Sequence, residues 1–177
     1  MTLLSPFARD WHRYGIRNCE FPQPLPLGWL APHKWVPTTY FVMSWDWDLG
    51  HVAIGFEPGY ESDGASIPML AGSIVDPVLA LPGSQPHDKL YETCAGVRPY
   101  RVRLPDGSIE FRHLRDANTG LPILFDGKHP VDDERRRARA DAILIAFWIA
   151  SGMSLGMAEL GYLAVRSEIG RRTWIAD

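Results

Sequence analysis

The chain has 177 residues, of which 46% are apolar and 22% are charged, and its formal net charge is −3. This length fits one compact domain with its own core. The charge is too small to draw the protein to nucleic acid or to anionic lipid. Two cysteines are too few for a disulfide framework or a zinc site. The longest apolar run, residues 142–150, is too short to cross a bilayer.

Residues 1–38 are rich in proline and tryptophan, as in FPQPLPLGWLAPHKWVP. Proline blocks helices and central strands alike, so we predict an irregular arm that packs through Phe21, Trp29 and Trp35, with Trp11 as a further candidate. The arm is either a structural wrap or a partner-binding segment, because exposed aromatic side chains anchor interfaces well. The first residues lack the basic start and apolar run of a signal peptide, so we expect a soluble protein at synthesis.

Two β-hairpins are predicted in the remaining residues. Residues 38–45 and 51–57 are rich in β-branched and aromatic side chains, and the polar DWDLG between them is typical of a turn. Apolar and charged residues also alternate on both sides of Asp106-Gly107. This pattern predicts a second hairpin, inserted at about 98–115.

Three helices are predicted, at about 86–95, 133–151 and 155–169. Pro86 suits a first helical turn, Gly152 ends the second helix, and Ser154 can cap the third. Together with the hairpins, these helices make an α+β fold with one core. We place it in a single domain over 39–177, with the two C-terminal helices packed on the helix that contains His87 and Asp88.

The first candidate site residues lie on this helix, in the stretch QPHDKLYETC. His87 and Tyr91 are four residues apart and share a helix face. Asp88 is about 100° further round the helix axis, so its side chain diverges from that of His87. This arrangement suits His87 as a general base, supported by Tyr91, beside a cation held by Asp88. The alternative is a structural helix terminus, in which Asp88 interacts with the positive end of the helix dipole.

Asp141 is the second candidate, at the start of the apolar run ADAILIAFW. On helical spacing it shares a face with Ile145 and Trp148, and a buried carboxylate is costly unless it is paired. His87 on an antiparallel helix is one possible partner, because Asp141 would orient its ring and raise its basicity. Arg137, one turn earlier on the same helix, is the other.

The loop SDGASIP contributes the third group of candidates. Gly64 permits tight backbone geometry, and Asp63 and Ser66 can bond nearby backbone N–H groups as turn residues. The functional alternative is that Asp63, with loop carbonyl oxygens, binds a hard divalent cation, with calcium favoured. Asp88 would then supply a further oxygen ligand.

These stretches resemble a family of phage and prophage proteins catalogued as domain of unknown function 1353. The resemblance covers roughly residues 50–95 and 133–170, and its motifs fall at Gly59–Pro68, His87–Tyr91, Ala140–Asp141 and Tyr162–Arg166. Tyr60 and Ser62 stand where the family has Phe and Thr. The family implies a phage or prophage origin and no established activity. It places the protein in the bacterial cytoplasm at synthesis, with association with a virion as an open possibility.

A weaker likeness is to secreted phospholipases A2, in which a helix carries His-Asp-x-x-Tyr. It implies His87 as the base, Asp88 as a calcium ligand, Tyr91 as a support and Asp141 as the acid that orients His87. The glycine- and cysteine-rich calcium loop of those enzymes is absent here. The likeness is therefore one of geometry.

Two functions follow as alternatives. The first is a metal-assisted hydrolase that acts on cell-envelope material such as lipid ester or peptidoglycan. The second is a non-catalytic component of a phage tail, neck or head, or a factor in its assembly, with other phage structural proteins as partners. In the second case His87 and Asp141 would be a buried polar clamp between helices.

Overall fold

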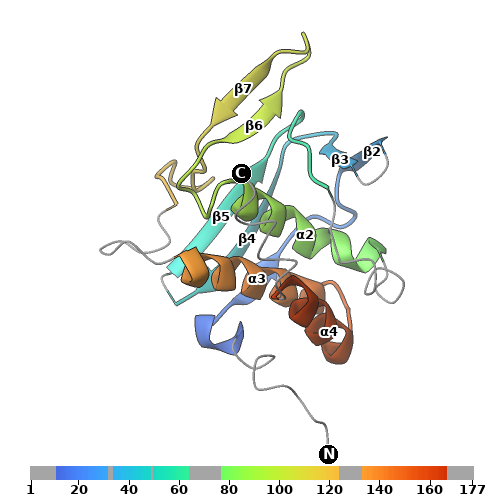
Figure 1. Ribbon diagram of the computed structural model, residues 1–177. Helices are drawn as coiled ribbons and strands as arrows, with labels where there is room; N and C mark the ends of the chain where they lie inside the picture. Colours follow the sequence, from blue (N-terminus) through green and yellow to red (C-terminus); the bar gives the residue numbers. More distant parts are fainter. Residues whose placement is uncertain (1–10, 32–33, 49, 64–76, 124–132, 167–177) are drawn as a thin grey trace, which may run out of the picture.

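The computed structural model describes residues 11–31, 34–48, 50–63, 77–123 and 133–166 (Figure 1). In these ranges a three-stranded sheet, two separate two-stranded ribbons and three helices surround one hydrophobic core. The predicted α+β fold class is confirmed.

The central sheet is built on the hairpin of β4 (Phe41–Trp47) and β5 (Gly50–Phe56), and β1 (Arg17–Glu20) pairs with the other edge of β4. Successive side chains of a strand point to opposite faces. One face of the hairpin therefore collects its largest apolar side chains, which are all buried: Phe41, Met43, Trp45, Trp47, Val52, Ile54 and Phe56. This face forms the sheet side of the core.

Residues 17–37, predicted to be irregular, contain short strands. Besides β1, the strands β2 (Leu27–Ala31) and β3 (Lys34–Pro37) form an antiparallel ribbon. The described prolines do not prevent these strands, because they lie between β1 and β2 or at the end of β3. Edge and terminal positions are where a strand tolerates proline.

The helix α2 runs from Pro77 to Glu92, so it begins well before its predicted start at Pro86. Pro82 and Pro86 lie inside it, and local propensity alone disfavours proline there by about 3 kcal/mol per residue. Hydrogen bonds from Trp148 of the next helix and from Ser151, just after that helix, attach this part of α2 to its neighbour. The Trp148 Nε1 donates to the carbonyl oxygen of Ala80 at 2.8 Å, and the Ser151 Oγ donates to that of Leu79 at 2.7 Å.

Gly83 explains how closely this part of α2 approaches its neighbour. A Cβ at this position would lie 2.5 Å from the Trp148 Cδ1 and 2.6 Å from the Leu144 carbonyl oxygen. Contacts this short are not tolerated between real atoms, so the approach of the two helices requires glycine here. Tertiary packing thus fixes the first two turns of α2.

The C-terminal helices are α3 (Asp133–Ala150) and α4 (Leu155–Val165), close to their predicted limits. Residues 167–169 of the predicted last helix lie outside the described ranges. The helix α3 packs against α2 on one side and α4 on the other (Figure 1). Its Phe147 ring meets the Trp45 ring of β4 at 5.9 Å, which joins the helical layer to the sheet. None of the described helices is long and apolar enough to cross a membrane.

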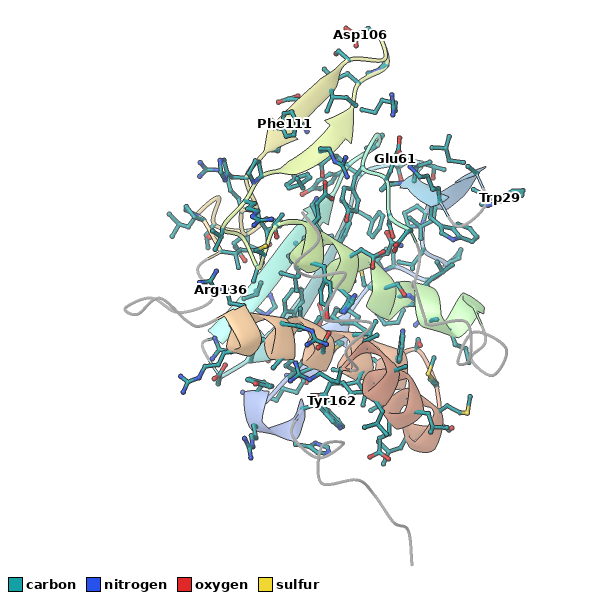
Figure 2. The ribbon with its side chains drawn as sticks, viewed as in Figure 1. Trp29, Glu61, Asp106, Phe111, Arg136 and Tyr162 are labelled. Carbon is teal, nitrogen blue, oxygen red and sulfur yellow. The ribbon has the colours of Figure 1, made fainter. Side chains whose placement is uncertain are left out.

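The inserted hairpin is formed by β6 (Tyr100–Arg103) and β7 (Ile109–Arg112). Asp106 and Gly107 lie in its turn, as predicted, and Gly107 has a φ of +84° that favours glycine. The hairpin extends beyond the helices at one end of the molecule, with Asp106 at its tip (Figures 1 and 2).

Candidate functional site

The helix α2 places His87 and Tyr91 on one face, one turn apart. Their ring centroids are 4.0 Å apart, with 34° between the ring planes. Both side chains contact the same carboxylate of α3: the His87 Nε2 lies 3.0 Å from the Asp141 Oδ1, and the Tyr91 hydroxyl donates to that oxygen at 2.5 Å. The structure thus brings together the three residues predicted as a catalytic group.

Asp141 is completely buried, and its second oxygen faces arginines. The Arg166 Nη1, at the end of α4, lies 3.2 Å from the Asp141 Oδ2. The Arg137 Nε lies 3.9 Å from the same oxygen. A buried carboxylate is costly in isolation, and here groups from α2, α3 and α4 compensate for its burial.

Both partners that the sequence offered for Asp141 are therefore present at once. Arg137 has further contacts, because its Nε donates to the Tyr91 hydroxyl at 3.3 Å and its Nη2 donates to the Val165 carbonyl oxygen at 2.7 Å. Sequence reasoning gave Arg166 no role. The sequence feature that could have identified Arg166 is its position as the last residue of the Tyr162–Arg166 motif.

Asp88 lies on the other side of His87. Its Oδ1 is 3.6 Å from the His87 Nδ1, and its Oδ2 accepts a hydrogen bond from the Ser62 hydroxyl at 2.6 Å. The Ser62 Oγ in turn accepts from the Gln85 Nε2 at 3.0 Å. Two backbone hydrogen bonds pair Ser62 with Trp35 of β3, at 2.8 and 2.9 Å. The loop before α2 is thus joined to the ring of His87 through Asp88.

The four motifs that carry the family resemblance converge in this network. Ser62 comes from the loop motif, His87 and Asp88 from the helix motif, Asp141 from the third and Arg166 from the fourth. Distant parts of the chain thus meet around one buried carboxylate.

Of the other loop residues predicted for the site, the structure describes only Asp63. Asp63 is exposed, and Gly64 and Ser66 lie outside the described residues. In the part of the chain that the structure describes, no three or more His, Cys, Asp or Glu side chains are arranged to hold a metal ion. Asp88, the other proposed cation ligand, already contacts Ser62 and His87. Calcium binding stays a prediction, because most of the loop whose carbonyl oxygens would take part lies outside the described residues.

The electrostatic surroundings of His87 favour its charged form. Burial alone would lower its pKa, but hydrogen bonds and charge interactions with Asp141 and Asp88 outweigh burial and raise the pKa from 6.5 to about 9. At neutral pH the ring is therefore an imidazolium, with a carboxylate facing each nitrogen. In this charge state His87 is an ion-pair partner of both carboxylates, and its predicted role as a base would require loss of this proton.

Tyr91 is held in its neutral, donating form. Burial is the main cause that raises the pKa of its hydroxyl, and the charge of Asp141 adds to it. The hydroxyl therefore stays protonated and donates to Asp141. Tyr91 and His87 both act as donors to this carboxylate.

A second buried cation, Lys89, was not anticipated. Its side chain is fully buried between α2 and the sheet, and its Nζ donates to the Gly55 carbonyl oxygen at 2.8 Å and to the Glu57 Oε2 at 3.1 Å. The Nζ also lies over the rings of Tyr100, Tyr60 and Phe56, at 3.8, 4.7 and 5.0 Å from their centroids. Burial lowers the pKa of Lys89 to about 8, despite Glu57.

The Glu57 carboxylate joins Lys89 to the inserted hairpin. Its Oε1 accepts from the Tyr100 hydroxyl at 2.6 Å and from the Arg112 Nη1 at 3.3 Å. Local sequence gave no signal for this cluster, because Gln85, Lys89 and Thr93 follow one another at helical spacing and resemble a solvent-facing stripe. All three are completely buried.

Comparison with known proteins gives no relative. No protein-family model matches the chain, and neither a curated protein nor a solved structure is significantly similar to it. The resemblance to the phage-associated family and the likeness to phospholipases A2 therefore stay predictions that rest on the motifs quoted above.

Proposed function

We propose that this protein is a non-catalytic structural or assembly component of a phage particle, acting in its tail, neck or head. One observation carries the proposal: each nitrogen of the His87 ring faces a carboxylate, and both oxygens of Asp141 face donors from the three helices. A group engaged in this way holds helices together. The phage context comes from the motif resemblance.

The distribution of exposed apolar side chains supports the same function. Each of the two ribbons carries two large exposed apolar side chains, Trp29 and Leu30 on β2 and Ile109 and Phe111 on β7. Aromatic side chains that remain exposed are frequent anchors of protein interfaces. In Figure 2, Trp29 and Phe111 lie on different ribbons, with Glu61 between them.

The proposal is tested by following the full-length chain during particle formation. Particles and assembly intermediates of a phage that encodes this sequence are separated on a density gradient, and the chain is quantified by mass spectrometry in each fraction. We expect it to co-migrate at a fixed ratio with a tail, neck or head protein. A chain that stays monomeric and outside every particle fraction would contradict an assembly role.

A metal-assisted hydrolase is the second candidate, favoured by the orientation of His87 by buried Asp141. In this candidate His87 is the base, Tyr91 supports it, and Asp88 and Asp63 are the proposed calcium ligands. The test is hydrolysis of lipid-ester and peptidoglycan panels with and without calcium, for the wild type and His87→Ala. Turnover by the wild type that a folded His87→Ala variant lacks would support it, and an inert wild type would count against it.

A further inference from the structure

The outer edge of β7 has no neighbouring strand among the described residues. The ribbon of β6 and β7 is two-stranded, and β6 contacts the body of the protein on its other side. An unpaired edge of this kind is a ready template for a further strand, and proteins usually cover or block it. Here it extends beyond the helices (Figure 1).

The register shows which backbone groups point outward. The Arg101 N–H donates to the Glu92 Oε1 at 3.0 Å and the Arg103 N–H donates to the Gly59 carbonyl oxygen at 2.8 Å, so both point away from β7. These residues lie opposite Phe111 and Ile109. In an antiparallel pair, facing residues alternate between bonded and non-bonded pairs. The N–H and C=O groups of Ile109 and Phe111 therefore point to the free edge.

The side chains of the same four residues lie on the outer face of the hairpin. Tyr100 and Val102 are buried on the inner face, so the alternation turns Arg101, Arg103 and their cross-strand partners outward. Phe111 is 64% exposed, and the Arg101 and Arg103 side chains are 68% and 54% exposed. The edge thus combines unpaired backbone groups, apolar surface and cations.

Arginine is frequent in this segment. Residues 98–115 contain five arginines and two acidic residues: Arg98, Arg101, Arg103, Arg112, Arg115, Asp106 and Glu110. Acidic side chains outside the segment, Glu92, Glu61 and Glu57, contact three of these arginines. The chain as a whole has a net charge of −3. The side chains of Arg101 and Arg103 each donate one hydrogen bond through the Nε, to Glu92 and to Glu61. Their terminal Nη groups donate no hydrogen bond within the described parts of the chain, and the side chains are 68% and 54% exposed, so these groups can meet carboxylates of a partner.

We propose that β7 is a docking edge for an extended segment of a protein partner that carries acidic and apolar side chains. The segment adds a strand beside β7, bonds the backbone groups of Ile109 and Phe111, and places carboxylates within reach of Arg101 and Arg103. A second copy of this chain fits less well, because it would bring a second set of arginines to the same face. The inference deepens the proposed assembly function and rests on it.

The test uses the full-length protein and short fluorescein-labelled peptides. One peptide alternates valine and glutamate, a second alternates valine and lysine, and a third carries a proline in the middle of the acidic sequence. Binding is followed by fluorescence anisotropy at low salt. We expect the acidic peptide to bind about tenfold more tightly than the other two. It alone has both the charge that complements the arginines and a backbone that can pair along the edge of β7. Equal binding of all three, or no binding, would overturn the proposal.

Variants locate the binding. Phe111→Pro removes one outward N–H without removing a bond to β6, and it should weaken acidic-peptide binding about tenfold. Leu160→Ser removes an exposed apolar side chain on α4 and is the matched control, with no expected change. Arg101→Gln with Arg103→Gln should keep the edge and lose the preference for glutamate over lysine. If circular dichroism shows that Phe111→Pro does not fold, the double arginine variant tests the proposal in its place.

The same experiment also tests two other ligands for the β7 edge, nucleic acid and a second copy of this chain. Tighter binding of an oligothymidylate probe than of the acidic peptide would overturn the proposal in favour of nucleic acid. Self-association that Phe111→Pro abolishes would overturn it in favour of a second copy. If the wild type joins phage particles and Phe111→Pro does so equally well, the edge is not the docking site and the assembly function stands. If acidic peptides bind but the chain joins no particle, only the assembly function fails.

Discussion

Two buried cations stand two residues apart on α2, and their surroundings act on them in opposite ways. His87 faces α3 and has a carboxylate at each ring nitrogen, and its pKa rises to about 9. Lys89 faces the sheet, where burial lowers its pKa to about 8 although Glu57 is in contact. Two carboxylates outweigh burial at His87, whereas at Lys89 one carboxylate shared with Tyr100 and Arg112 does not.

The difference shows what each face of α2 does. Charge balance holds the helical side together, since Asp141 lies among three cationic side chains. Burial of the lysine stem and ammonium among aromatic rings dominates on the sheet side. Removing a charge should therefore cost much more on the helical side, and each prediction below tests this contrast.

The largest expected effect is that of Asp141→Ala. The substitution leaves His87, Arg137 and Arg166 without their common counter-charge, and loss of one partner of a buried ion pair costs about 3–5 kcal/mol of unfolding free energy. Urea unfolding at neutral pH measures it. The control is Asp48→Ala, whose exposed carboxylate contacts Arg139 at 3.0 Å and should contribute less than about 1 kcal/mol. Similar losses for the two variants would contradict a central role for Asp141.

The pH dependence of stability is the next largest effect. The pKa of His87 is higher in the folded protein, at about 9, than its ordinary value of 6.5, so its contribution is complete below pH 6.5 and is lost as the pH rises through 9. The loss is on the order of 3 kcal/mol. Lys89 acts in the opposite direction above about pH 8, because the unfolded chain then binds more protons.

The clearest window therefore lies between pH 6.5 and pH 8, where the unfolded chain loses the His87 proton that the folded protein keeps, and Lys89 is still mainly protonated in both states. Urea unfolding across this window should show falling stability in the wild type and a flat profile in His87→Gln. His51→Gln, which changes an exposed histidine that contacts Asp46, should keep the wild-type slope. A slope that survives in His87→Gln would assign the dependence to another group.

Tyr91→Phe should have an intermediate effect. The substitution removes a hydroxyl that donates to Asp141 and accepts from Arg137, and hydrogen bonds to charged groups contribute about 1.5–3 kcal/mol. We expect a loss of about 2 kcal/mol in urea unfolding with little change in the ring packing on His87. Tyr40→Phe, at an exposed position, is the control and should leave stability unchanged. A neutral Tyr91→Phe would mean that the arginines and His87 satisfy Asp141 without it.

Sequence patterns predicted the residues with strong periodicity and missed those fixed by packing. Alternation in β4 and β5 and the helical spacing around Asp141 were sufficient to predict the sheet hairpin and α3. The start of α2 was not predictable, because Pro82 and Gly83 oppose a helix locally and tertiary contacts, including those with Trp148 and Ser151, stabilise it there. The contact of Arg166 with Asp141 depends on how α4 packs, which no local pattern specifies.

The smallest expected effect, and the one that separates the two faces of α2 most sharply, is that of Lys89→Met. Methionine can fill the space between Tyr100 and Tyr60, and Glu57 keeps its contacts with Tyr100 and Arg112. No buried charge is then left without a partner, so urea unfolding should show a loss of only about 1 kcal/mol. Lys34→Met, which changes an exposed lysine paired with Glu61, should be neutral within about 0.5 kcal/mol. A loss for Lys89→Met as large as that for Asp141→Ala would mean that charge balance also holds the sheet side together.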